Sequence, residues 1–129
     1  MTDDGRTPPS PLASQPGAAT TTLDPAAGQL VIINTYTVKP ERADELLDLL
    51  VRANVEVMQD VPGFISSNLH LSLDRRQLVN YAQWASVEAT VAARDNPEVQ
   101  ARIQAVAEVA DGFTPVLYAL RGCFPAHRG

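Results

Sequence analysis

The stretch LVIINTYTVKPERADELLDLL, residues 30–50, decides the fold. Its first part, residues 30–38, is rich in β-branched side chains and predicts a strand. Pro40 then stands where a first helical turn would begin, and acidic residues that suit the positive end of a helix dipole follow it. Apolar residues recur at the spacing of one helix face, which predicts a helix to about Gln59, before the Pro-Gly pair at 62–63.

The same signals define the remaining elements. Two runs of alternating residues predict a hairpin around a short Asp-Arg-Arg turn, and two helical stretches separated by Asn96-Pro97 follow it. The predicted strands are 64–72, 77–84 and 114–124, and the predicted helices begin at Val87 and after Pro97. The order β-α-β-β-α-β predicts an α+β, ferredoxin-like fold, an antiparallel sheet with helices on one face.

Residues 1–29 differ in composition from the rest of the chain. They hold five of the ten prolines and no aromatic residue, so they bury too little apolar surface to offset the entropy of ordering them. We therefore expect a disordered N-terminal tail at 1–29, one domain at 30–124 and a short C-terminal tail at 125–129.

Length, charge and cysteine content exclude several classes of protein. A chain of 129 residues allows one domain, and a net charge of −5 disfavours binding to nucleic acid. No apolar run reaches the roughly 20 residues that span a bilayer, and the N-terminus is unlike a secretory signal. The single cysteine, Cys123, cannot form an internal disulfide, which favours a cytoplasmic location.

The hairpin strands carry apolar residues on both of their faces. Two helices can cover only one face of a four-stranded sheet, yet the second face would still carry Leu69, Leu71, Val79 and Tyr81. That is more apolar surface than a small monomer usually exposes. We therefore expect a homodimer that buries this second face.

Motifs for several common chemistries are missing. The two histidines, His70 and His127, lie far apart in sequence, and no cluster has metal-ligand spacing. The chain also lacks a glycine-rich nucleotide loop, a serine elbow and an activating partner for Cys123. The residues therefore indicate neither a metal site nor a nucleotide site.

Uncharged polar residues inside the strands are the remaining candidates for a site. Asn34 interrupts the first strand, Asn68 and His70 alternate on the second, and Asn80 shares one face of the third with Trp84. A three-residue hairpin loop would place His70 across from Asn80, whereas a two-residue loop would place Leu69 there. In the first register all five side chains could converge on the helix-covered side, as in a small-molecule pocket.

The chain from residue 30 to 124 resembles the antibiotic biosynthesis monooxygenase family of small dimeric proteins with an α+β barrel. The resemblance rests on INTYTVKPERADELLDLL, PGFISSNLHLSLD, VNYAQWASVEA and PVLYALR. The most specific part is the Asn-x-x-x-Trp of NYAQW, followed by a Ser-x-Glu helix start. It looks most like the branch of cofactor-free oxygenases that convert anthrone or phenol rings of aromatic polyketides to quinones.

The resemblance implies a mechanism and a set of site residues. Molecular oxygen would be the co-substrate, and an oxidisable aromatic polyketide would supply the electrons. The implied catalytic residues are Asn34, Asn80, Trp84 and His70, and Tyr36 and Asn68 are candidates for substrate binding. Some members use a tyrosine early in the next helix, where this chain has Thr90 or its neighbours.

Three other functions fit the same superfamily. Haem degradation would use an axial histidine in the second helical region, but residues 87–111 contain none. A polyketide cyclase or isomerase would need acid–base groups and no oxygen, and His70 would serve it. A non-catalytic dimer that binds a small ligand would keep the pocket without the chemistry.

Overall fold

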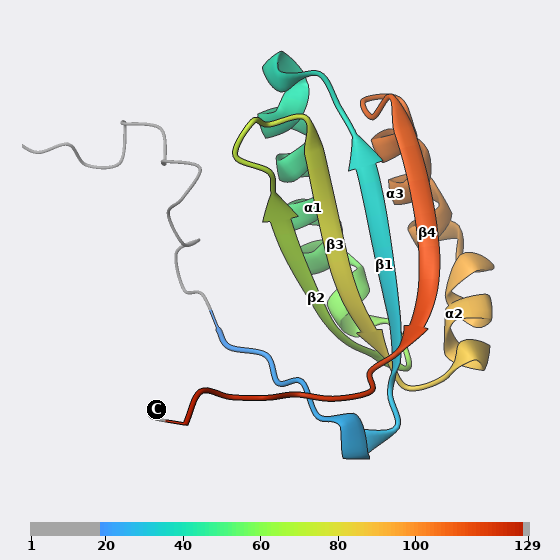
Figure 1. The fold of residues 1–129 in the computed structure, drawn as a ribbon. Coiled ribbons are helices and arrows are strands. Elements are labelled where there is room, and N and C mark those ends of the chain that lie inside the picture. Colours follow the sequence, from blue (N-terminus) through green and yellow to red (C-terminus); the bar gives the residue numbers. More distant parts are fainter. Residues whose placement is uncertain (1–18, 128–129) are drawn as a thin grey trace, which may run out of the picture.

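The computed structural model describes residues 19–127 and has four strands in one antiparallel sheet, in the order β2-β3-β1-β4 (Figure 1). The helices cover one face of this sheet, which confirms the ferredoxin-like α+β fold. The strands are β1 (Leu30–Thr37), β2 (Phe64–Leu71), β3 (Gln77–Trp84) and β4 (Gly112–Ala119), and the α-helices are α1 (Ala43–Glu56), α2 (Val87–Arg94) and α3 (Pro97–Ala107). In the part of the chain described, no helix is long and apolar enough to cross a membrane. The cytoplasmic location stays a prediction.

Two elements differ from their predicted extent by more than one residue. Helix α1 ends at Glu56, and a short 3-10 turn at Met58–Asp60 completes the segment that the periodicity assigned to one helix. Strand β4 ends at Ala119 rather than at residue 124. Ala119 pairs with Leu30, which is the first residue of β1, so later residues find no neighbouring strand to bond.

The core lies between the sheet and the helices, in two apolar clusters. Leu46 of α1 and Leu78 of β3 are fully buried in the first cluster, and Trp84 is buried in the second. Residues of the sheet that belong to these clusters face the helices, which identifies the covered side of β1, β2 and β3. These residues are Leu30, Ile32 and Tyr36 on β1, Phe64, Leu69 and Leu71 on β2, and Leu78, Ala82 and Trp84 on β3.

Gly63 sets the approach of α2 to the sheet. Its φ of 85° lies in the left-handed region, and a Cβ there would collide with the Cβ of Ala89 on α2. Its carbonyl oxygen accepts a hydrogen bond from the Ala85 amide at 2.8 Å. Only glycine therefore allows the start of β2, the end of β3 and the first turn of α2 to meet next to Trp84.

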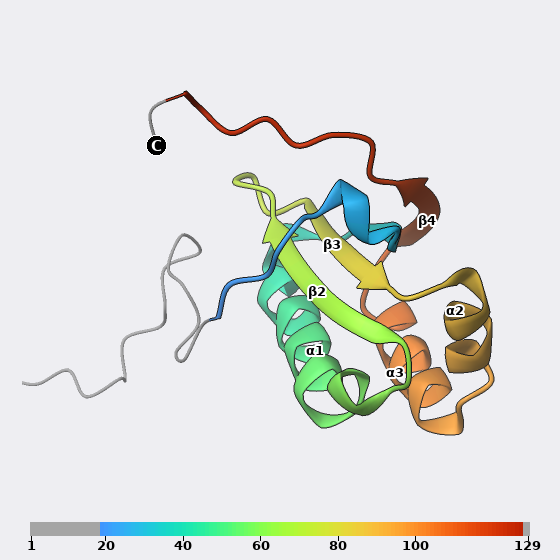
Figure 2. The ribbon, with the colours of Figure 1, turned by 90° about the horizontal axis from the view of Figure 1, so that it is seen from below.

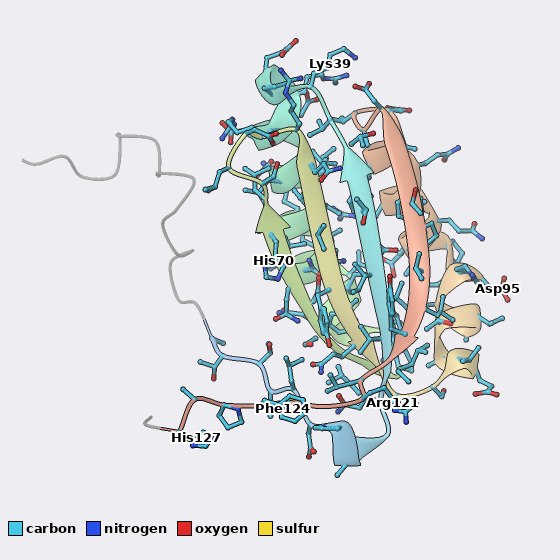
Figure 3. The ribbon with its side chains drawn as sticks, in the orientation of Figure 1. Lys39, His70, Asp95, Arg121, Phe124 and His127 are labelled. Carbon is cyan, nitrogen blue, oxygen red and sulfur yellow. The ribbon has the colours of Figure 1, made fainter. Side chains whose placement is uncertain are left out.

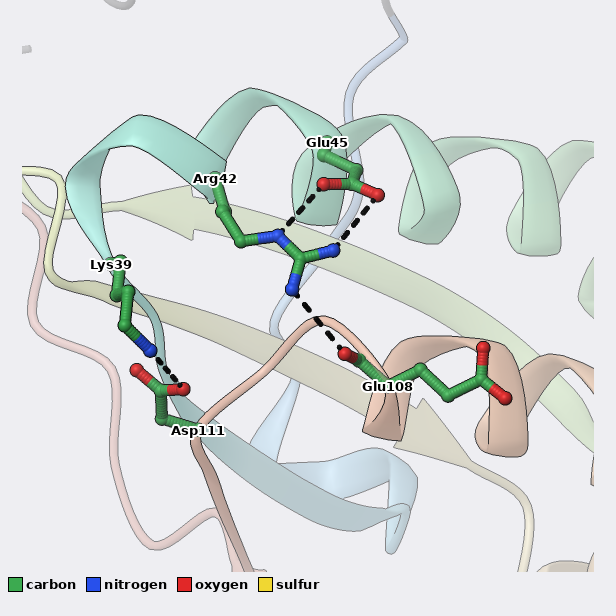
Figure 4. Close-up of polar contacts among 5 residues, drawn as sticks. All are labelled: Lys39, Arg42, Glu45, Glu108 and Asp111. Carbon is green, nitrogen blue, oxygen red and sulfur yellow. Dashed lines mark hydrogen bonds and ion pairs between the residues drawn. The ribbon is translucent and has the colours of Figure 1, made fainter.

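Ion pairs join the start of α1 to the end of α3 (Figure 4). The Arg42 guanidinium donates to both carboxylate oxygens of Glu45 and to the backbone oxygen of Glu108, and Lys39 pairs with Asp111 at 2.9 Å. The hydrogen bond and charge of Glu45 raise the pKa of Arg42 above its usual value. These contacts are exposed, so each contributes little to stability on its own.

Residues 19–29 lie on the side of the sheet away from the helices, as does the C-terminal segment after β4 (Figure 2). The Thr21 hydroxyl donates to Asn68 Oδ1 at 2.6 Å, and Gln83 Nε2 donates to the Thr22 carbonyl at 3.1 Å. Most of the predicted tail, residues 1–18, lies outside the described residues. That residues 1–29 are dispensable for folding stays a prediction.

Candidate active site

The faces of β2 follow from a bulge near its start. Phe64 pairs with Trp84 and Ser66 pairs with Gln83, so Ile65 is an extra residue without a partner across the ladder. The bulge places Phe64 on the helix-covered side with Trp84, while Ser66 lies on the other side with Gln83. Strict alternation from Phe64 would have put Ser66, Asn68 and His70 on its face and Leu69 and Leu71 on the other. The bulge instead turns Leu69 and Leu71 to the helix-covered side, so the expectation that they lie on the uncovered face with Val79 and Tyr81 is wrong.

The hairpin register separates Asn68 and His70 from the other candidates. Leu69 pairs with Asn80, Asn68 pairs with Tyr81, and His70 pairs with Val79. This is the register that the shorter loop predicts, and it turns Asn68 and His70 to the face that the helices leave open. His70 is labelled in Figure 3. The expectation that all five polar residues converge is wrong for these two. Their expected roles in catalysis and substrate binding stay predictions.

Asn68 and His70 have different surroundings on that open side. Asn68 Nδ2 donates to the Tyr81 carbonyl at 2.9 Å and to Ser66 Oγ at 3.2 Å, and Asn68 Oδ1 accepts from Thr21. The Asn68 amide therefore bonds the sheet and the segment before β1. His70 is exposed. Both side chains border a groove between α1 and the free edge of β2, which Thr21 and Asn54 also line.

Asn34 and Asn80 form a direct cross-strand pair at the centre of the sheet. They are register partners between β1 and β3, both are half-buried, and both lie on the helix-covered side. Trp84 shares this side, four residues further along β3. The structure thus places three of the four candidate catalytic residues on one face of the sheet, with Asn34 and Asn80 directly opposite each other. The direct pairing of Asn34 with Asn80 could not be read from the sequence, because the β1–β3 register joins residues 46 positions apart.

The side-chain N–H groups of these three residues are the donors of the candidate site. Within residues 19–127, neither the Asn34 amide, nor Asn80 Nδ2, nor the Trp84 indole N–H has a hydrogen-bond partner. Gln29 Oε1 is the only fully enclosed side-chain polar atom of this range without a partner, so the three donors remain within reach of solvent. Neutral donors on one side of a sheet are suited to binding a negatively charged oxygen.

Apolar and aromatic side chains surround this set of donors. Trp84 meets Phe64 edge to face, with the ring centroids 5.5 Å apart, and Ile32 lies next to it in the same cluster. Leu117 pairs with Ile32 across β1 and β4, and half of its surface is exposed. A flat aromatic molecule would find apolar contacts here beside the amides.

Ser67 is a polar neighbour of Asn80 that the sequence pattern does not indicate. Its hydroxyl donates to Asn80 Oδ1 at 2.6 Å across β2 and β3. Strict alternation from Phe64 would have placed Ser67 on the opposite face from Phe64, away from the candidate site. Only the bulge at Ile65 brings both to the helix-covered side, and no local sequence signal marks that bulge.

Tyr36 occupies the core rather than an open part of the site. Its ring stacks on Phe113 of β4 with centroids 5.0 Å apart, and it belongs to the cluster around Leu46. Burial raises the pKa of the Tyr36 phenol to about 12. Its expected role in substrate binding stays a prediction, and near neutral pH the phenol is protonated.

The raised pKa of Tyr36 predicts a loss of stability in alkaline solution. Because the phenolate is disfavoured in the folded state, the free energy of unfolding should fall by up to about 2–3 kcal/mol between pH 10 and 12. Denaturant titrations of wild type and Tyr36→Phe over this range measure the effect, and the variant should lack this part of the decline. Parallel pH profiles of the two proteins would contradict the assignment.

Thr90 stands where some resembling proteins are expected to carry a tyrosine. It is buried in α2, and its hydroxyl donates to the Val87 carbonyl at 2.6 Å, so this hydroxyl is engaged by its own helix. Between residues 19 and 127, no group of three or more histidine, cysteine or acidic side chains is placed to hold a metal ion.

Comparison with known proteins identifies the family. Residues 29–119 match the family described as Antibiotic biosynthesis monooxygenase. The chain belongs to this family. It is 38% identical over 79 residues to the tetracenomycin-F1 monooxygenase of Streptomyces glaucescens, a match that covers 61% of this chain and 70% of that protein. The resemblance inferred from the sequence is thereby confirmed, and the protein is a monooxygenase.

Solved structures of the family share the fold. ActVA-Orf6 of Streptomyces coelicolor, a monooxygenase solved with nanaomycin D, is 28% identical with a TM-score of 0.71, over 78% of this chain and 95% of that one. SnoaB of Streptomyces nogalater, described as a cofactor-independent oxygenase, is 21% identical with a TM-score of 0.69, over 77% and 99%. At this identity the likeness to SnoaB shows a shared fold.

Proposed function

We propose that this monooxygenase oxidises an anthrone or phenol ring of an aromatic polyketide to a quinone with molecular oxygen and without a cofactor. The observation that carries the proposal is the cross-strand pair Asn34–Asn80, whose donors have no partner among residues 19–127 and lie on the same face as Trp84 and its apolar neighbours. The names of the relatives support the substrate class, since one acts on tetracenomycin F1 and another binds nanaomycin D.

The chemistry follows from the electronic state of oxygen. Dioxygen is a triplet and reacts poorly with closed-shell carbon, so a protein without a metal or flavin needs an electron-rich substrate. Loss of the benzylic C–H proton of an anthrone gives a delocalised anion that can pass one electron to oxygen. Recombination then forms a C–O bond, and loss of water from the peroxide leaves the quinone carbonyl. One O₂ is consumed and one water is released per ring.

The residues of the site would stabilise charge rather than supply electrons. As the proton leaves, negative charge builds up on the ring oxygen, where Asn34, Asn80 and the Trp84 N–H can donate hydrogen bonds. We propose that the substrate's own phenolate takes the proton, because His70 lies on the opposite face of the sheet from these donors. This assignment leaves His70 with at most an indirect role.

A direct assay tests the proposed reaction. Incubating the purified, metal-free protein in air with a hydroxyanthrone, which carries the phenol that the proposed proton transfer needs, should produce the quinone absorbance together with oxygen uptake in equal molar amounts. A new ring without oxygen uptake would show a cyclase or isomerase instead. Binding without turnover would show a ligand-binding protein.

We also propose that the protein is a homodimer joined through the open face of the sheet. Ile33, Val79, Tyr81, Val116 and Tyr118 lie on this face by register, and Val116 and Tyr118 keep 40% and 46% of their surface exposed in one chain. Such a surface is more apolar than small monomers usually leave in water.

Sedimentation at micromolar concentration should therefore give twice the mass of the chain. Val116→Glu should shift the protein toward monomer, because it places a charge in the buried interface. Leu73→Glu is the matched control, since Leu73 is 81% exposed in the β2–β3 loop and should leave the dimer intact. A wild-type monomer would contradict the proposed dimer.

A further inference from the structure

Ser67 does not belong to the proposed set of donors, but its hydroxyl contacts one of them, Asn80. Ser67 Oγ lies 2.6 Å from Asn80 Oδ1, and both residues are half-buried on the helix-covered side. Ser67 pairs with Ala82 and not with Asn80, so the contact runs diagonally across the two strands. It occupies the oxygen of the Asn80 amide and leaves Nδ2 as the end available to a ligand.

The two ends of an amide have opposite effects on a charged substrate. Nδ2 donates hydrogen bonds and would stabilise a ring oxyanion, whereas Oδ1 is an acceptor and would repel it. A rotation of the Asn80 amide by half a turn exchanges the two ends. Whatever binds Oδ1 therefore favours the arrangement in which Nδ2 faces the reacting oxygen.

We propose that Ser67 is a positioning residue that holds and polarises the Asn80 amide for oxyanion binding, an inference that rests on the proposed function. When Ser67 donates to Oδ1, it completes a chain from its hydroxyl through the amide to the ring oxygen. Such chains strengthen cooperatively, because a hydrogen bond to the carbonyl makes the amide N–H a better donor. The effect grows as charge develops, so it acts on kcat more than on KM.

A matched pair of variants isolates the hydroxyl. Ser67→Thr keeps it and Ser67→Val replaces it with a methyl group of the same shape, and both residues suit a strand. Ser67→Val should turn over the anthrone about 3–10-fold more slowly than Ser67→Thr, with little change in KM. Equal kcat values for the two variants would overturn the proposal.

A double-mutant cycle shows whether Ser67 acts through Asn80. In an Asn80→Ala background, the difference between the Thr and Val variants at 67 should disappear. A difference of the same size in that background would mean that Ser67 acts by another route. Ser66→Val is a control for loss of a strand hydroxyl, because Ser66 Oγ bonds Gln83 on the opposite face at 2.6 Å and should affect stability rather than kcat.

A second measurement separates this proposal from the proposed function. In ¹⁵N–¹H spectra of the ligand-free protein, the side-chain amide signal of Asn80 should keep its position in Ser67→Thr and move in Ser67→Val. This result would support the contact even if no anthrone were oxidised. An Asn80 signal that is the same in both variants would overturn it, whatever the wild-type activity.

Discussion

Trp84→Phe should lower turnover of the anthrone by about 10²–10³-fold while the protein stays folded. The substitution keeps most of the apolar volume that packs against Phe64, so its cost in stability should be near 1 kcal/mol. It deletes the indole N–H, which we propose to donate to the oxyanion. Asn80→Ala should lower kcat to a similar extent, and in addition it leaves the Ser67 hydroxyl without its acceptor.

His70→Ala is the contrasting variant, because it tests whether the donors on the helix-covered side or the imidazole on the other side carry the activity. His70 is exposed on the other face of the sheet, so its removal should keep most of the activity. The pH profile of the rate between pH 5 and 8 should also be the same in this variant as in wild type, since His70 would not take the proton. A large His70 effect together with a small Trp84 effect would contradict these roles and leave the fold unaffected.

Leu46→Ala should destabilise the protein by about 2–5 kcal/mol. Leu46 is fully buried where α1 packs on the sheet, in the cluster with Leu78 and Tyr36, so truncation leaves a cavity that its neighbours fill only in part. Urea titration followed by circular dichroism would measure the loss as a lower midpoint with an unchanged slope.

Leu73→Ala provides the matched control for this measurement. The same change of side chain at a position that is 81% exposed should alter stability by less than about 0.5 kcal/mol. Both variants must be compared with wild type at one protein concentration, because dimerisation would add to the apparent stability. Equal midpoints for the two variants would show that the cluster around Leu46 is not a packed core.

The sequence was most informative where a strand is regular. β3 has no bulge, so simple alternation correctly places Asn80, Ala82 and Trp84 on one face and Val79, Tyr81 and Gln83 on the other. The element order and the break at 62–63 likewise follow from local signals, since proline, glycine and helical periodicity act over a few residues.

The composition of the candidate site depended on the pairing of strands that are distant in sequence, which local patterns do not encode. The β1–β3 register brings Asn34 to Asn80, and the backbone pairing of the whole sheet sets that register. On β2, the extra residue Ile65 reversed the expected faces and placed Ser67 rather than His70 beside Asn80.

The bulge at Ile65 is a position at which the strand can lose or gain one residue without a change in the pairing of the residues that follow. Since Ile65 has no partner across the ladder, deleting it would join Phe64 to Ser66 and restore strict alternation. Every residue from Ser66 to Leu71 would keep its face and its partner on β3. A gain or loss of one codon at this point could thus pass through evolution without moving Ser67 away from Asn80, whereas the same event within the rest of the strand would turn the residues before it to the wrong side of the sheet.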